Sequence, residues 1–328
     1  MGDLKQRSKA TFGNVLKEIE RLRGQLADLQ LSGADRAQIW SKMNELDELL
    51  YREEMLWLQR SRITWLKEGE RNTKYLHRRA VWRARRNLIQ RLMKADGSWC
   101  VAPSEMERMA SSYFKEVFTK DPTLDPNEVL DTISPKVSVE MNEALCRAYT
   151  EEEISNALFQ IGPLKAPGCD GFPARFYQWN WATLKVEIVA AVQEFFSSGV
   201  MPDGVNDTSI VLIPKVPHPR ELKDFRPISI IHSFAKIVAK AMSAELAPLI
   251  PKLVHQNQSA FIAGRSILDN FMLVQQSIRT LHRKRVPTII FKINIAKAFH
   301  SVSWQFLLEV LAHRGFGPRS RQRIATLL

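Results

Sequence analysis

Residues 289–304 read Ile289-Ile-Phe-Lys-Ile-Asn294-Ile-Ala-Lys-Ala-Phe299-His300-Ser-Val-Ser-Trp304. The β-branched run at the start of this stretch predicts a buried strand. Beyond Trp304 the apolar residues Phe306, Leu307, Val310 and Leu311 return at helical spacing, which predicts an amphipathic helix. Asn294 stands where the strand ends and the helix is approached, a position at which enzymes hold catalytic groups. The simpler alternative is an ordinary strand-to-helix turn in which Asn294 caps the following helix.

The same residues resemble the first palm motif of reverse transcriptases of LINE-type (non-LTR) retrotransposons, specifically of the plant kind. That motif has the frame Asp-Ile-x-Lys-Ala-Phe/Tyr-Asp-x-Val-x-Trp. The chain keeps six positions of the frame: Ile295, Lys297, Ala298, Phe299, Val302 and Trp304. It departs at both acidic positions, with Asn294 at the first Asp and His300 at the second. The resemblance implies a right-hand polymerase fold and RNA-directed DNA polymerase chemistry.

These two departures bear on the metal site that the resemblance implies. Polymerases clamp the reacting oxygens with two Mg²⁺ ions, and Mg²⁺ prefers anionic oxygen ligands. Asn294 offers only a neutral carbonyl oxygen, and His300 brings a nitrogen ligand that suits Zn²⁺ or Ni²⁺ better. We therefore expect no intact metal site and no productive Mg²⁺ binding. A zinc enzyme built around His300 is the weakest alternative, because no second ligand is recognisable nearby.

Two further stretches resemble the fingers of the same family. In residues 206–231 the resemblance places Lys215 and Arg226 against the triphosphate of the incoming nucleotide. The alternative is a pair of solvated loop charges. Residues 258–270 resemble the second fingers motif, which implies that Arg265 lies near nucleotide and template. The alternative is a glycine turn before a helix over 269–282, with Ser266 as its N-cap.

Phe299 has two interpretations as well. The family places an aromatic gate at this position, which excludes the 2′-hydroxyl of ribose from the nucleotide site. The alternative is an ordinary core phenylalanine.

The resemblance covers roughly residues 10–328. Residues 57–77 match the segment that joins endonuclease and polymerase in these elements, and residues 165–173 match a family loop to which we assign no chemistry. The Tyr/Phe-x-Asp-Asp motif of the family does not occur in this sequence. We therefore expect a truncated reverse transcriptase domain, a pseudoenzyme.

The positive charge of the chain is concentrated in residues 60–94, which we call the basic segment. It holds twelve Lys or Arg and two acids, a net charge of +10 against +12 for the whole chain. Cations interleaved with Trp65, Tyr75 and Trp82 suit phosphate contact and base stacking. The residues predicted to bind RNA or DNA are Arg71, Lys74, Arg78, Arg79, Arg83, Arg85, Arg86 and Arg91. The alternative is a solvated helix face.

Residues 11–60 carry two apolar stripes at helical spacing, separated by Ser32-Gly33-Ala34-Asp35. This pattern predicts a helical hairpin that packs on itself or on the body. A short dimeric coiled coil through residues 11–60 is an open alternative. Residues 88–99, with Asp96-Gly97 in their centre, predict a β-hairpin.

The composition indicates the general class of protein and its cellular compartment. Hydrophobic residues make up 45% of the 328, which is ample for a core, and 25% are charged. The three cysteines are far apart and lack metal-ligand spacing, as expected of free thiols in a reducing compartment. No apolar run is long enough to span a membrane, and the N-terminus is no signal peptide. We expect an intracellular protein, nuclear or cytoplasmic, with no membrane partner and no small-molecule cofactor.

Together these patterns predict a helix-rich α+β protein in four parts. They are a helical hairpin (1–60), a basic helix and β-hairpin (61–120), an N-terminal extension of the fingers (121–205), and fingers with the start of a palm (206–328). The expected function is that of an inactive fragment of a retrotransposon reverse transcriptase. The alternatives are a non-catalytic RNA- or DNA-binding protein acting through the basic segment, and a helical interaction module.

Overall fold

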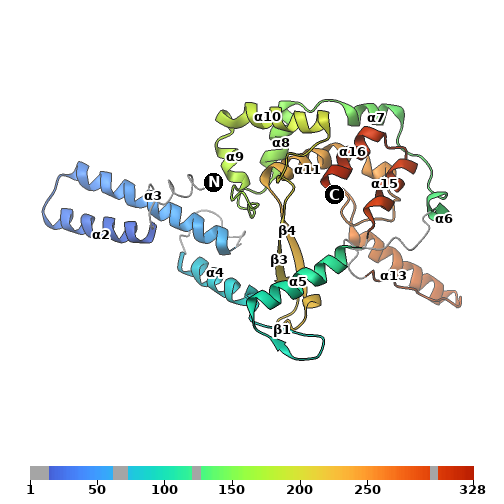
Figure 1. Cartoon of the computed structure of the whole chain (residues 1–328), viewed down its shortest axis with the longest axis horizontal. Coiled ribbons are helices and arrows are strands. Elements are labelled where there is room, and N and C mark those ends of the chain that lie inside the picture. Colours follow the sequence, from blue (N-terminus) through green and yellow to red (C-terminus); the bar gives the residue numbers. More distant parts are fainter. Residues whose placement is uncertain (1–14, 62–72, 120–126, 296–301) are drawn as a thin grey trace. The chain divides into compact units, whose positions relative to one another are not determined.

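The computed structural model, drawn in Figure 1, describes residues 15–61, 73–119, 127–295 and 302–328. The chain divides into two compact units. The first unit contains the chain up to Val101 together with Val211–Ile228. The second contains Ala102–Ile210 and Ser229–Leu328. Helices predominate and the strands are few, which confirms the helix-rich α+β class. The four-part division stays a prediction.

The first unit begins with the helical hairpin that the apolar stripes predict. Helices α2 (Val15–Leu31) and α3 (Arg36–Ser61) are joined at the expected break, and α3 also packs against α4 (Thr73–Asn87). The stripe on α2 buries Ile19, Leu22 and Leu26. Dimerisation through residues 11–60 stays a prediction.

Two small sheets lie wholly or mostly in the first unit. Strands β1 (Leu92–Met93) and β2 (Trp99–Cys100) pair antiparallel around the predicted Asp-Gly turn, where Gly97 has a left-handed φ of +82°. Strands β3 (Ser209–Pro214) and β4 (Phe225–Ile230) form the other sheet, joined through the short 3₁₀ helix η1 (Leu222–Asp224). The backbone N–H of Met93 donates to the carbonyl of Arg220 at 2.8 Å, which links the two hairpins.

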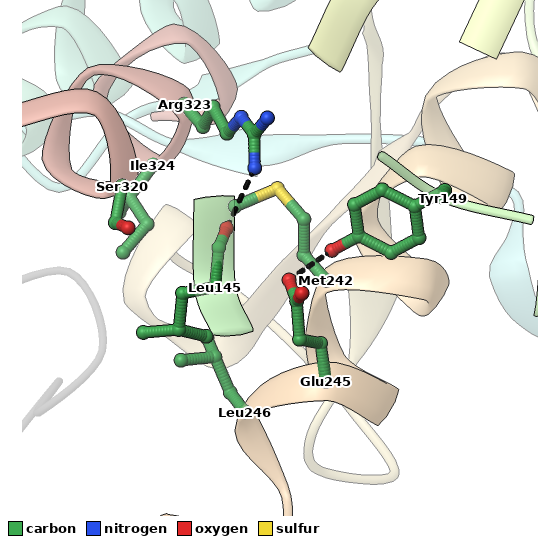
Figure 2. Close-up of a pocket in the computed structure, with 8 residues that line it drawn as sticks. All are labelled: Leu145, Tyr149, Met242, Glu245, Leu246, Ser320, Arg323 and Ile324. Atoms are coloured by element: carbon green, nitrogen blue, oxygen red, sulfur yellow. Dashed lines mark hydrogen bonds between the residues drawn. The ribbon is translucent and has the colours of Figure 1, made fainter. Parts of the chain in front are cut away.

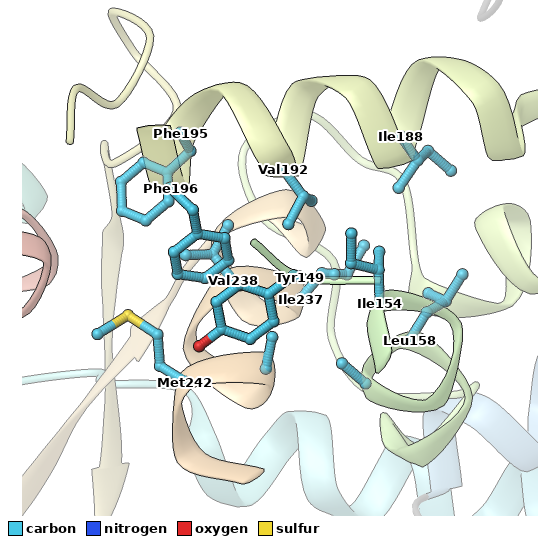
Figure 3. Close-up of a cluster of buried hydrophobic side chains, with 12 residues drawn as sticks. Tyr149, Ile154, Leu158, Ile188, Val192, Phe195, Phe196, Ile237, Val238 and Met242 are labelled. Carbon is cyan, nitrogen blue, oxygen red and sulfur yellow. The ribbon is translucent and has the colours of Figure 1, made fainter. Parts of the chain in front are cut away.

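The second unit is helical. Its described helices are α5 (Pro103–Phe118), α6 (Asn127–Leu130), α7 (Val139–Cys146), α8 (Glu151–Gln160), α9 (Ala174–Trp179), α10 (Trp181–Ser198), α11 (Ser233–Leu246), α12 (Ile250–Leu253), α13 (Ile267–Arg283), α15 (Trp304–His313) and α16 (Pro318–Leu327). The main core lies where α8, α10 and α11 meet (Figure 3). Ile154, Val192 and Ile237 are fully buried there. None of the helices in the described ranges is long and apolar enough to cross a membrane.

The predicted buried strand at 289–293 is wrong. Residues 287–295 form no strand, and their side chains face solvent, with Ile289 92% and Phe291 83% exposed. A buried strand needs neighbouring strands on which to pair, and the described residues provide none beside this segment. The predicted helix is confirmed as α15, whose N-cap is Ser303 because its hydroxyl accepts from the N–H of Phe306. Gly315 follows α15 with a left-handed φ of +94°.

Candidate nucleic-acid interface and the sites of the palm motif

Helix α4 separates its buried and its charged residues cleanly. Leu76 and Ala80 are buried, and His77 packs edge-on against Trp57 of α3 at 4.3 Å between ring centroids. The predicted nucleic-acid residues Lys74, Arg78, Arg79, Arg85 and Arg86 are all exposed on this helix. Arg83 is half-buried and has contacts within the protein, and Arg71 lies outside the described residues. The sequence therefore folds into a helix held by one face that offers cations on the other.

Trp82 lies among these cations. The guanidinium carbon of Arg79 lies 4.8 Å from the centroid of the Trp82 ring, and that of Arg86 lies 5.2 Å from it. The two arginines stand three residues before and four residues after Trp82, which are the spacings at which side chains meet on a helix. Trp82 is 47% exposed, so it is no core residue. This spacing of arginine and tryptophan in a helical segment is the sequence pattern that predicts the stack.

The β1–β2 hairpin carries a second pair of the same kind. The guanidinium carbon of Arg91 lies 4.2 Å from the centroid of the Trp99 ring, and Trp99 is 40% exposed. The cross-strand neighbours Leu92 and Cys100 are buried. Because side chains alternate across a strand, the hairpin has one buried face and one solvent face that carries Trp99. Trp99 was not among the residues predicted from the sequence.

The fingers residues Lys215 and Arg226 lie together on the β3–β4 hairpin. Lys215 is fixed through its backbone N–H, which donates to the carbonyl of Asp224 at 2.7 Å, and its Nζ donates to the carbonyl of Lys223 at 2.8 Å. Arg226 is exposed, and within the described ranges no carboxylate lies in ion-pair distance of it. Both cations are thus presented to solvent by one hairpin. Contact with a nucleotide triphosphate stays a prediction.

Asp224 organises the turn that joins these strands. Its carboxylate accepts from the backbone N–H groups of Arg220 at 2.9 Å and Glu221 at 3.1 Å. Those two hydrogen bonds, the one from Arg220 first, hold the pKa of Asp224 below its usual value. The carboxylate, charged at neutral pH like any aspartate, thus closes the turn through these two hydrogen bonds.

Arg265 is held by backbone carbonyls of the chain that precedes it. Its guanidinium donates to the carbonyls of His255 and Gln258, each at 2.7 Å, and to those of Pro251 and Val254 at 3.2 and 3.3 Å. These hydrogen bonds hold the end of α12 and the loop between α12 and α13 around one guanidinium group. In this structure Arg265 organises its loop, and its contact with a nucleotide stays a prediction.

The same loop contains a residue that the sequence did not single out. Phe261 has a left-handed φ of +65°, and its side chain is 94% exposed. Such a backbone costs energy for a bulky residue and is found more often at functional sites. Ser266 caps α13 as predicted, since its hydroxyl accepts from the N–H of Leu268 at 3.2 Å.

The palm position Asn294 is exposed, and Phe299 and His300 lie outside the described residues. Within the described ranges, no three His, Cys, Asp or Glu side chains gather as a metal site would require. A neutral amide at an exposed position does not fit the anionic oxygen site that Mg²⁺ needs.

The loop 165–173, for which we predicted no chemistry, holds the start of α11. Lys236 Nζ donates to the carbonyl of Ala166 and the Ser233 hydroxyl to that of Phe172, each at 2.7 Å. Asp170 lies 3.2 Å from His232 Nδ1. A Cβ atom on Gly168 would lie 2.6 Å from the His232 Cα, so only glycine fits there.

A polar cluster in the second unit also escaped prediction (Figure 2). The Arg323 guanidinium is buried, and it donates to the carbonyls of Phe196 at 2.7 and 3.0 Å and of Leu145 at 2.8 Å. Beside it, the Tyr149 hydroxyl donates to Glu245. Burial raises the pKa of Glu245 and of Tyr149 and lowers the pKa of Arg323. These groups line a small pocket. Because they lie far apart in the sequence, no sequence pattern predicts that they meet.

Comparisons with known proteins support the resemblance to reverse transcriptases and to non-LTR retrotransposon proteins. Residues 213–327 match the family described as reverse transcriptase (RNA-dependent DNA polymerase). This segment of the chain is homologous to reverse transcriptases. It includes every position that the palm and fingers motifs single out: Lys215, Arg226, Arg265, Asn294, Phe299 and His300.

Two relatives extend the similarity beyond this segment. The chain is 30% identical over 319 residues to the "Transposon TX1 uncharacterized 149 kDa protein" of Xenopus laevis, a match that covers 95% of this chain and 24% of that protein. It is 23% identical over 211 residues to the "Retrovirus-related Pol polyprotein from type-2 retrotransposable element R2DM" of Drosophila melanogaster, which covers 62% of this chain and 18% of that protein. The chain therefore spans about a quarter or less of the length of these relatives. Its similarity to proteins of non-LTR retrotransposons extends over both units.

Proposed function

We propose that this chain is part of a LINE-type retrotransposon reverse transcriptase, of the plant kind, that binds RNA or DNA through its basic segment and does not polymerise nucleotides. The observation that carries the binding is the exposed cationic face of α4, with its apolar face buried against α3. Cations held on a rigid element match the spaced phosphates of a nucleic-acid backbone.

Removing charges from α4 tests this proposal. The double variant Arg78→Ala, Arg85→Ala removes two exposed cations and leaves the Arg79–Trp82–Arg86 stack intact. We expect its affinity for labelled RNA or DNA to fall roughly tenfold, similarly for all sequences, and its salt slope to fall by about two. Fluorescence anisotropy measures both quantities.

A matched control comes from α2. The variant Lys17→Ala, Arg23→Ala also removes two exposed cations but lies outside the basic segment. It should bind as the wild type does. Equal losses in the two variants would show that only net charge matters, which would contradict a defined interface on α4.

The proposed lack of polymerase activity rests on the two palm positions. Asn294 and His300 replace the acids of the family motif, and the neutral Asn294 side chain lacks the charge that a metal site there requires. We expect no primer extension with Mg²⁺ or Mn²⁺, and none after Asn294→Asp alone, since His300 remains. Template-dependent extension by the purified chain would overturn this part of the proposal.

The proposal also includes binding of a nucleotide triphosphate by the two fingers cations. Lys215 and Arg226 are exposed on one hairpin, which supports a role in holding the triphosphate. For Arg265 the support is weaker, because four carbonyls already engage its guanidinium. The aromatic gate at Phe299 rests on the motif alone.

A further inference from the structure

Two tryptophans of the first unit are exposed and each is stacked with arginine. In the first group the guanidinium groups of Arg79 and Arg86 lie over the ring of Trp82. In the second group the guanidinium of Arg91 lies over the ring of Trp99. We call these groups the two Arg–Trp stacks. Since both indoles are about half exposed, core packing does not account for them.

The stacks lie on elements whose other faces are anchored. Leu76 fixes α4, and Leu92 with Cys100 fixes the β1–β2 hairpin, all at 2% exposure or less. The indoles and guanidinium planes are therefore presented by rigid supports. Such preorganised flat surfaces lose little conformational freedom when a planar group stacks on them.

The chemistry of the stacks distinguishes between paired and unpaired strands. A duplex hides the faces of its bases and offers phosphates, for which scattered cations are enough. An unpaired strand can turn its bases outward and stack them on aromatic rings or on guanidinium planes while cations track its backbone. Flat stacks accompanied by exposed cations such as Arg78 and Arg85 match the second arrangement.

We infer that α4 and the β1–β2 hairpin hold unpaired RNA or DNA, with bases stacked against the two Arg–Trp stacks. This inference rests on the proposed nucleic-acid binding and specifies the form of the strand. RNA and single-stranded DNA share the base faces and phosphates that the site uses. Their relative affinity is set by contacts to the 2′-hydroxyl, which the stacks do not require.

The test compares a labelled 20-nucleotide RNA, a DNA of the same sequence and the duplex of that DNA by fluorescence anisotropy. The wild-type protein should bind both single strands more tightly than the duplex. Trp82→Ala and Trp99→Ala should each weaken single-strand binding by about 5- to 100-fold, as expected for one lost base stack. Duplex affinity should change less than about twofold, and the salt slope should not change, because no charge is removed.

Trp179 supplies a matched control. It is exposed, and Arg175 lies over its ring at 4.4 Å, but it belongs to α9 in the second unit. Trp179→Ala should leave single-strand binding unchanged. Trp82→Phe keeps an aromatic plane and should keep most of the affinity, and a melting curve for each variant excludes loss of folding as the cause.

The outcomes separate this inference from the proposed function. Equal affinity for single strands and duplex, with silent tryptophan variants, would overturn the stacking and leave the cationic binding intact. Trp82→Phe as weak as Trp82→Ala would also overturn it. No salt-sensitive binding to any of the three ligands would instead contradict the proposed function.

Discussion

At the residue scale, the buried cation of Arg323 is stabilised by hydrogen bonds to backbone carbonyls. The residue is 3% exposed, and its guanidinium donates to the Phe196 and Leu145 carbonyls and lies over the Phe196 ring at 5.1 Å. Glu245 and the Tyr149 hydroxyl lie nearby (Figure 2). Burial lowers the pKa of Arg323, but a guanidinium remains charged around neutral pH. The cation therefore ties α16 to the segments that carry Phe196 and Leu145.

Removing this cation should destabilise the second unit. Arg323→Ala leaves two buried carbonyls without a donor, and we expect a loss of about 3–5 kcal/mol in the free energy of unfolding. Arg323→Lys keeps the charge but not the planar fork and should recover part of the loss. Urea unfolding measures both. Arg319→Ala, which removes an exposed cation from the same helix, should change stability by less than about 0.5 kcal/mol; equal effects at the two positions would contradict the account.

Glu153 predicts a dependence of stability on pH. Its hydrogen bond with Arg147 lowers its pKa to about 2, and it also closes the capping box of α8 with Thr150. The folded pKa lies below the unfolded value, so the stabilisation is complete above about pH 4.5 and is lost as the pH falls towards 2. Both side chains face water in part, so the contribution is about 1 kcal/mol.

The variant Glu153→Gln isolates this contribution. It should be less stable than the wild type at pH 7, and the difference should shrink as the pH falls from 4.5 towards 2. Denaturant melts at a series of pH values measure the difference. A difference that does not depend on pH would show that the charge of Glu153 is irrelevant.

At the element scale, the loop 165–173 depends on the close approach of Gly168 to His232. Gly168→Ala places a Cβ atom 2.6 Å from backbone that cannot swing aside. We expect a loss of about 1–3 kcal/mol, the usual effect of overpacking. Gly24→Ala is the opposite case, because nothing lies within 4 Å of its Cβ and it stands inside α2.

The helix should be stabilised by Gly24→Ala by about 1 kcal/mol. Thermal unfolding of the two variants gives opposite signs if the loop is packed as described. Stabilisation by both substitutions would contradict the close contact at Gly168.

The elements that the sequence predicts well are those whose cause is local. Helical spacing predicts α2, α3 and α15, and the Asp-Gly turn predicts the β1–β2 hairpin. The strand predicted at 289–293 does not form, because a strand depends on partners far away in sequence, and β-branched residues cannot supply them. The cluster around Arg323 has no signal in the sequence for the same reason, since its carbonyl partners lie 127 and 178 residues away. The Arg–Trp stack on α4 could be predicted from the sequence, since its residues are three and four positions apart on one helix.

At the scale of the whole molecule, charge is the property that most directly suggests a function. The net charge is +12, and the basic segment alone contributes +10 of it. In the described part of that segment, the cations of α4 are mostly exposed. A chain of this kind should meet polyanions with a strong dependence on salt.

The salt dependence of binding tests this central claim most directly. Anisotropy titrations of the folded wild-type chain with a labelled single-stranded RNA, repeated between about 50 and 200 mM salt, give the slope of log affinity against log salt. If the basic segment neutralises about 6–10 phosphates, affinity should fall by roughly 10³–10⁵ across this range. A flat dependence, or no binding at low salt by a folded sample, would contradict the account and leave the cationic face of α4 merely solvated.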